Sequence, residues 1–283
     1  MPSTSATREF AGARGHDCGD PEREQALQGA CRHPAHGSPL TGELRIIPVA
    51  DLPEIEADDD LAELITARIE LEDGDVVVLA QKIVSKSEGR VIELASIEPS
   101  GEAIEIAGDD DDPRRIEVIL REAARVVRVR PPLVIAETTH GFICASAGVD
   151  SSNAPAPGML VLLPVDPDAS AARIRERLGD LTGKTVAVLI TDSFGRPWRQ
   201  GTIDVALGAS GLEVMRDLRG TRDRVGYELH ATQIAVADEI ASAAELVMGK
   251  VDGIPAAIVR GLEVAGDGIA HDLVIPEERD LFR

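Results

Sequence analysis

The chain has 283 residues, 43% of them hydrophobic, which is enough for one large domain with a sizeable core. Its formal net charge of −21 argues against general nucleic-acid binding, because phosphate backbones attract basic surfaces. No stretch reaches the roughly 18 uninterrupted apolar residues of a membrane span. The three cysteines (Cys18, Cys31 and Cys144) form no C-x-x-C pair, so we expect a soluble protein of the reducing cytoplasm.

Residues 1–42 differ in composition from the rest of the chain. They are rich in Gly, Ala, Pro, Ser and charged residues, show no sustained periodicity, and lack the apolar segment of a secretory signal. We therefore expect a disordered extension over 1–42 and a folded domain over 43–283.

The first predicted elements follow from hydrophobic periodicity and capping residues. A strand is expected at 44–49, then a helix capped by the acids at 58–60, then a buried strand at 75–86 that emerges into polar loop residues. A short strand follows at 90–94, and the acidic run at 109–113 introduces a second helix.

The second half mixes strands and helices without strict alternation. The predicted strands are 125–129, 133–138, 142–150, 159–165, 185–192 and 254–261, and the predicted helices are 169–183 and 232–248. This order favours an α+β (mixed α/β) fold, with mixed and antiparallel sheets and flanking helices, over a Rossmann fold.

One predicted strand runs into GVDSSN, Gly148 to Asn153, which offers the Asp150 carboxylate and neighbouring hydroxyls. A carboxylate at a strand end can bind a hard cation such as Mg²⁺ or Mn²⁺ without burying an unpaired charge. The alternative is an ordinary Asx or Ser turn, which this segment favours when it is taken alone.

Another strand ends in TDSFGRPWRQG, Thr191 to Gly201. Asp192 and Ser193 offer metal ligands, and the arginines that follow suit phosphate, so the segment fits phosphoryl chemistry. A surface turn with ion-paired arginines is the alternative. It explains less well why the only tryptophan, Trp198, lies in a polar turn.

A third segment, QKIVSKSEGR (81–90), places Lys82 and Lys86 after a buried strand, where they can bind triphosphate oxygens. Ordinary surface charge is the alternative. GDLTGKT (179–185) looks like a P-loop but has one residue too few between its glycines, so Gly183 is predicted as a helix C-cap and Lys184 as a last-turn cation.

No pair of a nucleophile and a base stands out, so no catalytic residue is assigned. His140 and Cys144 point to the same face of a predicted strand. Cys144 lies in an apolar run and is expected to be a buried, inert thiol, whereas His140 is expected to line the site.

Taken in order, several segments resemble the coenzyme F-420:L-glutamate ligases, from about Leu44 to the C-terminus. They are PVADLPEI, DVVVLAQKIVSKSEGR, HGFICASAGVDSSN, TDSFGRPWRQGTIDVALGASG, DLRGTRDRVGYEL and AVADEIASAAELVMGK. The combination of motifs is far more specific than any one of them. Some relatives carry a C-terminal flavin-binding domain that this sequence lacks, so the stand-alone ligase is expected.

The resemblance implies an enzyme that uses GTP and two divalent ions, Mg²⁺ or Mn²⁺, with K⁺ assisting. It would join L-glutamate to the deazaflavin precursor F-420-0 and add a further glutamate by a γ-linkage. The implied course is phosphorylation of the acceptor carboxylate, followed by attack of the glutamate amine. The resemblance also implies the family's own fold, with two intertwined lobes, and a homodimer.

By resemblance, Asp150 and Asp192 are metal ligands, Ser193 assists a second ion, and Asn153 contacts the nucleotide. The other implied GTP contacts are Ala50, Asp51, Leu52, Pro53, Gln81, Lys86, Gly249 and Lys250. The family often has Ser where this chain has Gln81, and Thr where it has Ser193. The residues alone also fit a metal-dependent phosphohydrolase or kinase, or a non-catalytic nucleotide-binding protein.

Overall fold

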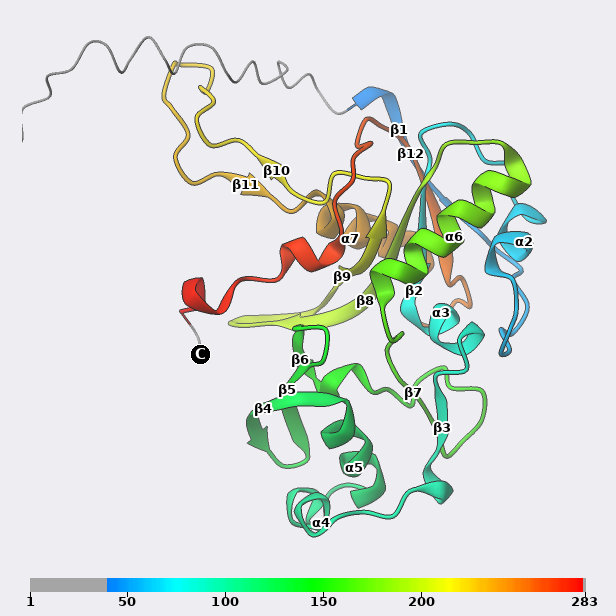
Figure 1. Cartoon of the computed structure of the whole chain (residues 1–283), viewed down its shortest axis with the longest axis vertical. Coiled ribbons are helices and arrows are strands. Elements are labelled where there is room, and N and C mark those ends of the chain that lie inside the picture. The colour runs from blue at the N-terminus through cyan, green and yellow to red at the C-terminus, as the bar shows by residue number, and fades with distance from the viewer. Residues whose placement is uncertain (1–39, 282–283) are drawn as a thin grey trace, which may run out of the picture. The chain divides into compact units, whose positions relative to one another are not determined.

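The computed structural model describes residues 40–281, so the extension expected at 1–42 lies outside them except for its last three residues, which belong to strand β1. The centre is a mixed sheet in which neighbouring strands run antiparallel, apart from the parallel pair β2–β8 (Figure 1). Its strands, in spatial order, are β1 (Leu40–Pro48), β12 (Ala256–Leu262), β2 (Val76–Ala80), β8 (Ala187–Arg196) and β9 (Arg199–Ser210).

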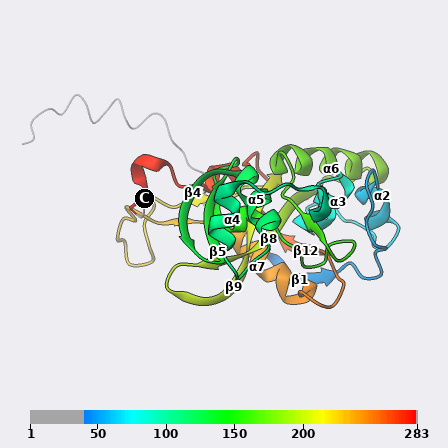
Figure 2. The ribbon, with the colours of Figure 1, turned by 90° about the horizontal axis from the view of Figure 1, so that it is seen from below.

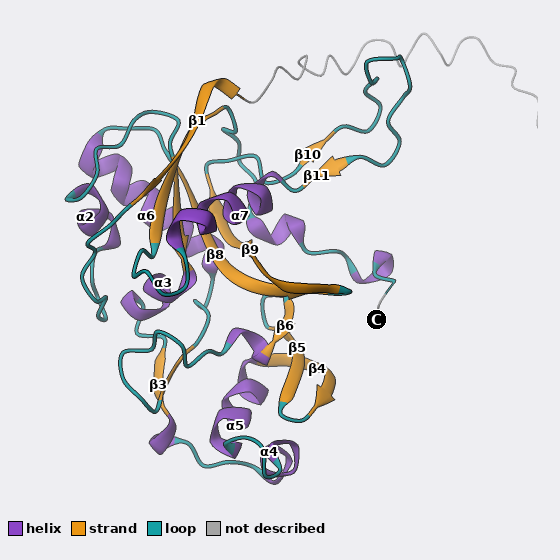
Figure 3. Ribbon diagram, turned by 180° about the vertical axis from the view of Figure 1, so that it is seen from behind, coloured by secondary structure: helices purple, strands orange, loops and turns teal. Residues whose placement is uncertain are grey.

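Helices cover both faces of this sheet (Figure 3). Val76 and Val78 on β2 pack toward α7 (Val236–Met248), whereas Val77 and Leu79 pack toward the opposite face. Alternate residues of a strand point to opposite faces, so a strand that is covered on both sides needs an uninterrupted apolar run. The helices of the opposite face are α2 (Leu61–Thr66), α3 (Gln81–Ser87) and α6 (Pro167–Thr182).

Two predicted helix ends are confirmed. The Asp60 side chain caps α2 by accepting hydrogen bonds from the amides of Ala62 and Glu63. Gly183 ends α6 with a φ of 69°, a left-handed conformation that glycine adopts without strain. Within residues 40–281, no helix combines the length and the apolar character that crossing a bilayer would require.

A second group of elements packs around its own core, which includes Ile116, Ile119, Val134 and Leu160. Figure 2 shows this group in front of the central sheet. Its elements are β3 (Val91–Glu93), α4 (Gly101–Ala107), α5 (Pro113–Glu122), β4 (Ala123–Arg130), β5 (Leu133–Thr138), β6 (Ile143–Ala145) and β7 (Met159–Val161). A small ribbon of β10 (Arg216–Asp217) and β11 (Gln233–Ile234) completes the strands of the described chain.

The predicted α+β class with mixed and antiparallel sheets is confirmed, but the strand predicted at 75–86 is wrong in its second half. β2 ends at Ala80, and residues 81–87 form helix α3. Residues 81–86 are all buried, polar and apolar alike, so the seven-residue helix α3 has no solvent-exposed polar face to give a helical period, and Ala80 gives no side-chain cap. The short helix α4 was not predicted, although Ser100 caps it.

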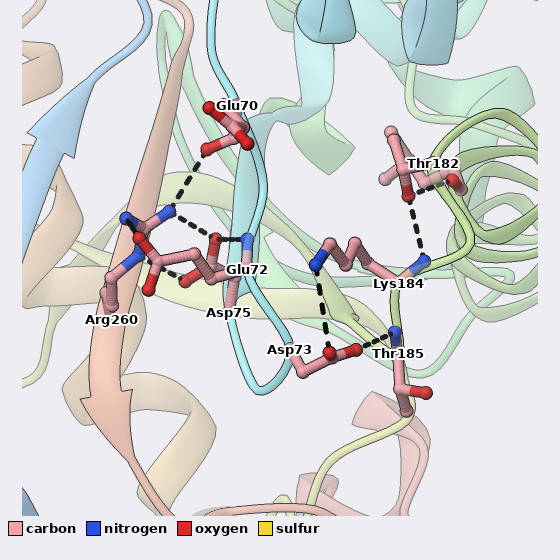
Figure 4. Close-up of polar contacts among 9 residues, drawn as sticks. Glu70, Glu72, Asp73, Asp75, Thr182, Lys184, Thr185 and Arg260 are labelled. Carbon is pink, nitrogen blue, oxygen red and sulfur yellow. Dashed lines mark hydrogen bonds and ion pairs between the residues drawn. The ribbon is translucent and has the colours of Figure 1, made fainter.

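At the edge of the sheet where β2 begins, a buried ion pair joins Arg260 on β12 to Asp75, the residue before β2 (Figure 4). Asp75 is fully buried and accepts hydrogen bonds at 2.7 Å from both Nε and a terminal nitrogen of Arg260. The Glu72 amide donates to the same carboxylate at 2.8 Å. Nearby, Lys184 Nζ lies 3.9 Å from Asp73 Oδ2 on an exposed turn. The lysine of the GDLTGKT segment therefore makes a surface ion pair.

Candidate active site

The register of the central sheet brings distant segments to one edge. Ala80 on β2 pairs with Thr191 on the parallel strand β8, so the residues after β2 emerge beside Asp192. The antiparallel strand β12 begins, and β1 ends, at this same edge, which adds the loops 49–55 and 249–255. These segments enclose a cavity of about 330 Å³.

Most of the residues predicted from the sequence line this cavity. They are Leu52, Pro53, Gln81, Lys86, Asn153, Asp192, Ser193, Gly249 and Lys250. Ala50, Asp51 and Asp150 are not part of the lining, although Asp150 is joined to it through Lys82. His140 lines a different cavity, beside the start of α6.

Asp150 is fixed by both its backbone and its side chain. Its amide and carbonyl pair with Val161, and Gly148 just before it has a φ of 74°; a Cβ there would lie 2.6 Å from Leu163. Lys82 Nζ lies 2.5 Å from Asp150 Oδ2, and Ser152 donates to both oxygens of the carboxylate. Burial would raise the pKa of Asp150, but the hydrogen bonds from Lys82 and Ser152 outweigh it and lower the pKa to about 2.

Asp192 and Ser193 lie where β8 passes into a long hairpin with β9. Opposite them stands Asp204, which is buried, lines the cavity and was not predicted from the sequence. Asp204 accepts hydrogen bonds from the hydroxyls of Thr191 at 2.9 Å and Ser193 at 2.7 Å. Because the Ser193 proton points at Asp204, the oxygen lone pairs remain for a cation.

Two carboxyl groups that line the cavity, those of Asp192 and Glu245, have raised pKa values. Burial raises the pKa of Asp192 to about 6, with the Asp204 charge adding to the effect and the Lys82 charge opposing it. Glu245, on α7, has its pKa raised by burial and by Asp204. Such shifts mark places where several acids share a poorly solvated space and a cation would be favourable.

The cationic side of the cavity is built from three segments. Lys86 on α3 forms an ion pair with Glu54, which connects α3 to the loop after β1. Asn153 Nδ2 donates to the Lys250 carbonyl at 3.3 Å, which connects GVDSSN to the loop before β12. Gln81 is 1% exposed; its Oε1 accepts from Ser85, but its Nε2 has no hydrogen-bond partner.

The prediction that Cys144 is a buried thiol is confirmed. Burial raises its pKa to about 12, helped by the negative charge of Asp192. A thiol with this pKa carries almost no thiolate at neutral pH, so it is a poor nucleophile.

Within residues 40–281, no three His, Cys, Asp or Glu side chains converge closely enough to hold a metal ion by themselves. Mg²⁺ is usually bound through only one or two carboxylates together with water and substrate phosphates. The arrangement of acids and lysines therefore suits a metal that arrives with a phosphorylated substrate better than a closed structural metal site.

Sequence comparison supports the relationship that the motifs suggest. The family described as F420-0:Gamma-glutamyl ligase matches residues 50–261. The protein called coenzyme F420:L-glutamate ligase from Methanopyrus kandleri is 50% identical over 247 residues, which cover 85% of this chain and 98% of that protein. The protein of the same name from Methanothermobacter thermautotrophicus is 44% identical over 250 residues, which cover 85% of this chain and 99% of that protein. The protein of that name from Methanocaldococcus jannaschii is 47% identical over 227 residues, covering 79% and 90%. With matches of this extent, the chain belongs to the F420-0:gamma-glutamyl ligase family.

Proposed function

We propose that this chain is a GTP-dependent ligase that joins L-glutamate to F-420-0 and extends the product by a γ-linked glutamate. Its relatives are named coenzyme F420:L-glutamate ligase, and the F420-0:gamma-glutamyl ligase family matches most of the folded chain. The observation that best supports GTP as the energy source is one cavity that holds Lys86 and Lys250 beside Asp192 and Ser193. Cations for a triphosphate and oxygens for a hard metal are thereby adjacent.

The donor set of the cavity fits Mg²⁺ or Mn²⁺. Asp192 and the Ser193 hydroxyl line the cavity and are hard oxygen donors, and Asp150 is joined to the lining through Lys82. Asp204 accepts the Ser193 proton, which leaves the Ser193 lone pairs for a cation. We propose that Asp150 and Asp192 bind one ion and Ser193 assists a second. When bound, these ions supply positive charge that neutralises the triphosphate.

The proposed chemistry has two steps. A carboxylate oxygen of the acceptor attacks the γ-phosphorus of GTP, the bond from that phosphorus to the bridging oxygen breaks, and GDP leaves. The amine of L-glutamate then attacks the acyl carbon, inorganic phosphate leaves with the bonding electrons, and the amine gives up a proton. A carboxylate is a poor electrophile until one of its oxygens becomes such a leaving group.

The chain's own groups bind and orient the substrates in this scheme. Lys86 and Lys250 place positive charge where the phosphates would lie, and the unpartnered Gln81 Nε2 offers a donor to a ligand oxygen. Asn153 and the adjoining loops after β1 and before β12 would hold the base and ribose.

The test is a reaction of purified protein with Mn²⁺, GTP, L-glutamate and F-420-0, followed by mass spectrometry of the deazaflavin. We expect glutamylated product, and GDP release over many turnovers only when both glutamate and F-420-0 are present. Asp192→Asn should lower the turnover about 100-fold or more while the protein stays folded, and Lys184→Met, far from the cavity, should have no effect. GTP turnover without glutamate would instead indicate a phosphohydrolase or kinase, and bound GTP without turnover would indicate a binding protein.

Two further parts of the proposal have separate measurements. We propose that K⁺ assists the reaction, so replacing KCl by NaCl should lower the rate at constant ionic strength. We also propose that two copies of the chain form a homodimer, which light scattering coupled to size-exclusion chromatography would detect. A monomer with full activity would remove the dimer from the proposal and leave the reaction unchanged.

A further inference from the structure

Lys82 is a buried cation that holds one carboxylate oxygen. Only 11% of its side chain is exposed, and its ammonium lies 2.5 Å from Asp150 Oδ2 and 2.7 Å from Ser152 Oγ. Ser152 Oγ also donates to Asp150 Oδ2 at 2.7 Å, and the Ser152 amide donates to Oδ1 at 2.8 Å. Both oxygens of Asp150 are therefore already used by groups of the protein.

The charge of Lys82 also reaches Asp192, and a second ammonium lies near Asp150. The positive charge of Lys82 acts on Asp192, and Lys250 Nζ approaches Asp150 Oδ2 to 3.8 Å. Lys82 thus already contacts the Asp150 oxygen that a divalent cation bound to Asp150 would use. A divalent cation in direct contact with Asp150 Oδ2 would lie close to the Lys82 ammonium, which is 2.5 Å from the same oxygen, and the two charges would repel each other strongly in a poorly solvated space.

We propose that Lys82 competes with the divalent cation for Asp150 and moves onto a nucleotide phosphate when the cation binds. This inference rests on the metal and GTP sites of the proposed function. A buried ammonium that loses its carboxylate needs another anion. Asp204 cannot readily serve, because its oxygens accept from Thr191 and Ser193, whereas a phosphate oxygen fits beside Lys86 and the Gln81 donor.

The exchange makes the binding of metal and nucleotide cooperative. Metal alone has to displace Lys82 without offering it a new partner, so it binds weakly. Nucleotide offers that partner, and thermodynamic linkage requires that each ligand raises the affinity for the other by the same factor. Lys82 would then disfavour a metal ion that arrives without its phosphate.

The first experiment measures Mn²⁺ binding alone, by the electron paramagnetic resonance signal of free Mn²⁺. Lys82→Met removes the competing charge with little change in volume, so Mn²⁺ should bind about tenfold tighter or more than in the wild type. Lys82→Arg, which keeps the charge, should remain close to the wild type. Lys184→Met is the matched control for the same substitution outside the cavity, and it should leave Mn²⁺ binding unchanged.

The second experiment adds GDP at saturating Mn²⁺ and follows binding by calorimetry. Lys82→Met should bind GDP about tenfold more weakly or worse, because one charge-assisted contact to phosphate is lost. The factor by which GDP tightens Mn²⁺ binding should shrink in the same variant. In Lys82→Met the affinity for Mn²⁺ should rise while the affinity for GDP falls, whereas general damage to the site would lower both. Thermal unfolding of each variant checks the fold.

Asp150→Asn separates this inference from the proposed function. If Asp150→Asn binds Mn²⁺ as the wild type does, Asp150 is not a metal ligand and both proposals about it fail. If Asp150→Asn loses Mn²⁺ but Lys82→Met binds it no more tightly than the wild type, only the competition is overturned. Should Lys82→Met fold poorly, Lys82→Gln removes the same charge and has the same expected result.

Discussion

Two ion pairs lie at the two ends of strand β2, and they differ in burial and in hydrogen-bond geometry. At the start of β2, Arg260 contacts both oxygens of the fully buried Asp75. At the other end, Lys82 contacts a single oxygen of Asp150, whose side chain is 36% exposed. The first pair closes the sheet, whereas the second borders the cavity.

The chemistry of the two cations explains the difference. A guanidinium matches a carboxylate with two parallel hydrogen bonds in a fixed plane, so the pair is specific in geometry and hard to exchange. An ammonium is a point charge on a flexible chain and can turn to a new anion. Arginine therefore suits the end of β2 that must stay closed, and lysine suits the end where we propose an exchange.

Removing one carboxylate charge from each pair gives the largest expected contrast. Asp75→Asn should lower the free energy of unfolding by roughly 3–5 kcal/mol, because a buried guanidinium loses its counter-charge. Asp150→Asn should cost less, roughly 1–2 kcal/mol: Lys82 also loses a counter-charge, but the Asp150 side chain is partly exposed to water. Urea denaturation of both variants measures the change in the free energy of unfolding. Equal losses would show that the two ion pairs contribute alike to stability.

At the Lys82 end of β2, Asp192 and Asp150 should make the free energy of unfolding depend on pH in opposite directions. The folded-state pKa of Asp192 is about 6, above its ordinary 3.8, so the stability it contributes is fully present below 3.8 and is lost as the pH rises through 6. Relative to Asp192→Asn, the wild type should lose on the order of 2–3 kcal/mol across that window. Asp150, with a pKa of about 2, has the opposite sign: its contribution is present above 3.8 and disappears as the pH falls toward 2.

This pair of signs can be checked by urea denaturation at pH values spanning both windows, without divalent cations. A wild type that parallels Asp192→Asn at every pH would mean that the Asp192 carboxyl is not the source of the dependence. The Asp75–Arg260 pair should contribute equally to the stability of the wild type and of Asp192→Asn, because Asp192→Asn leaves that pair intact.

Asp204 provides a smaller test on the cavity side. Asp204→Asn keeps the volume but weakens the acceptor of the Thr191 and Ser193 protons, so Mn²⁺ affinity should fall about 10–100-fold. Asp238→Asn is the matched control: this partly buried acid accepts from the Ala206 amide outside the cavity, and its loss should leave Mn²⁺ affinity unchanged. Equal effects of both substitutions would contradict a role for Asp204 in orienting Ser193.

The smallest effect is expected at the exposed lysine near the Asp75 end. Lys184 is 39% exposed and lies 3.9 Å from Asp73, so Lys184→Met should change the free energy of unfolding by no more than about 0.5 kcal/mol. Thermal unfolding measures this. A loss as large as that of Asp75→Asn would show that the exposed turn contributes to closing the sheet.

Parts of this arrangement could be predicted from the sequence because they depend on local signals. Neighbouring residues in the sequence indicate the cap at Asp60 and the end of α6 at Gly183. They also indicate that β8 and the segment before Asp150 end in polar residues. The helix α3 could not be recognised, since its residues are buried on all sides and its period is hidden.

Asp204 was missed for a different reason. Its place opposite Ser193 depends on the register of the β8–β9 hairpin, and that register shifts between Gly195 and Arg196. Counting outward from the turn would therefore pair Ser193 with Thr202 instead. The signal that was available is an acid in the apolar run IDVALGAS, where an unexplained charge indicates a buried partner.

The tip of the same hairpin has an optical consequence. Trp198, the chain's only tryptophan, lies at the turn with a φ of 56° and is 83% exposed. Its emission already comes from a side chain in water, so unfolding would hardly change its colour, whereas a ligand or second protein that covers the tip would shift it toward shorter wavelengths. The emission of the single tryptophan is thus nearly insensitive to denaturation, but it can report what approaches the β8–β9 hairpin, which carries Asp192 and Asp204 at its base.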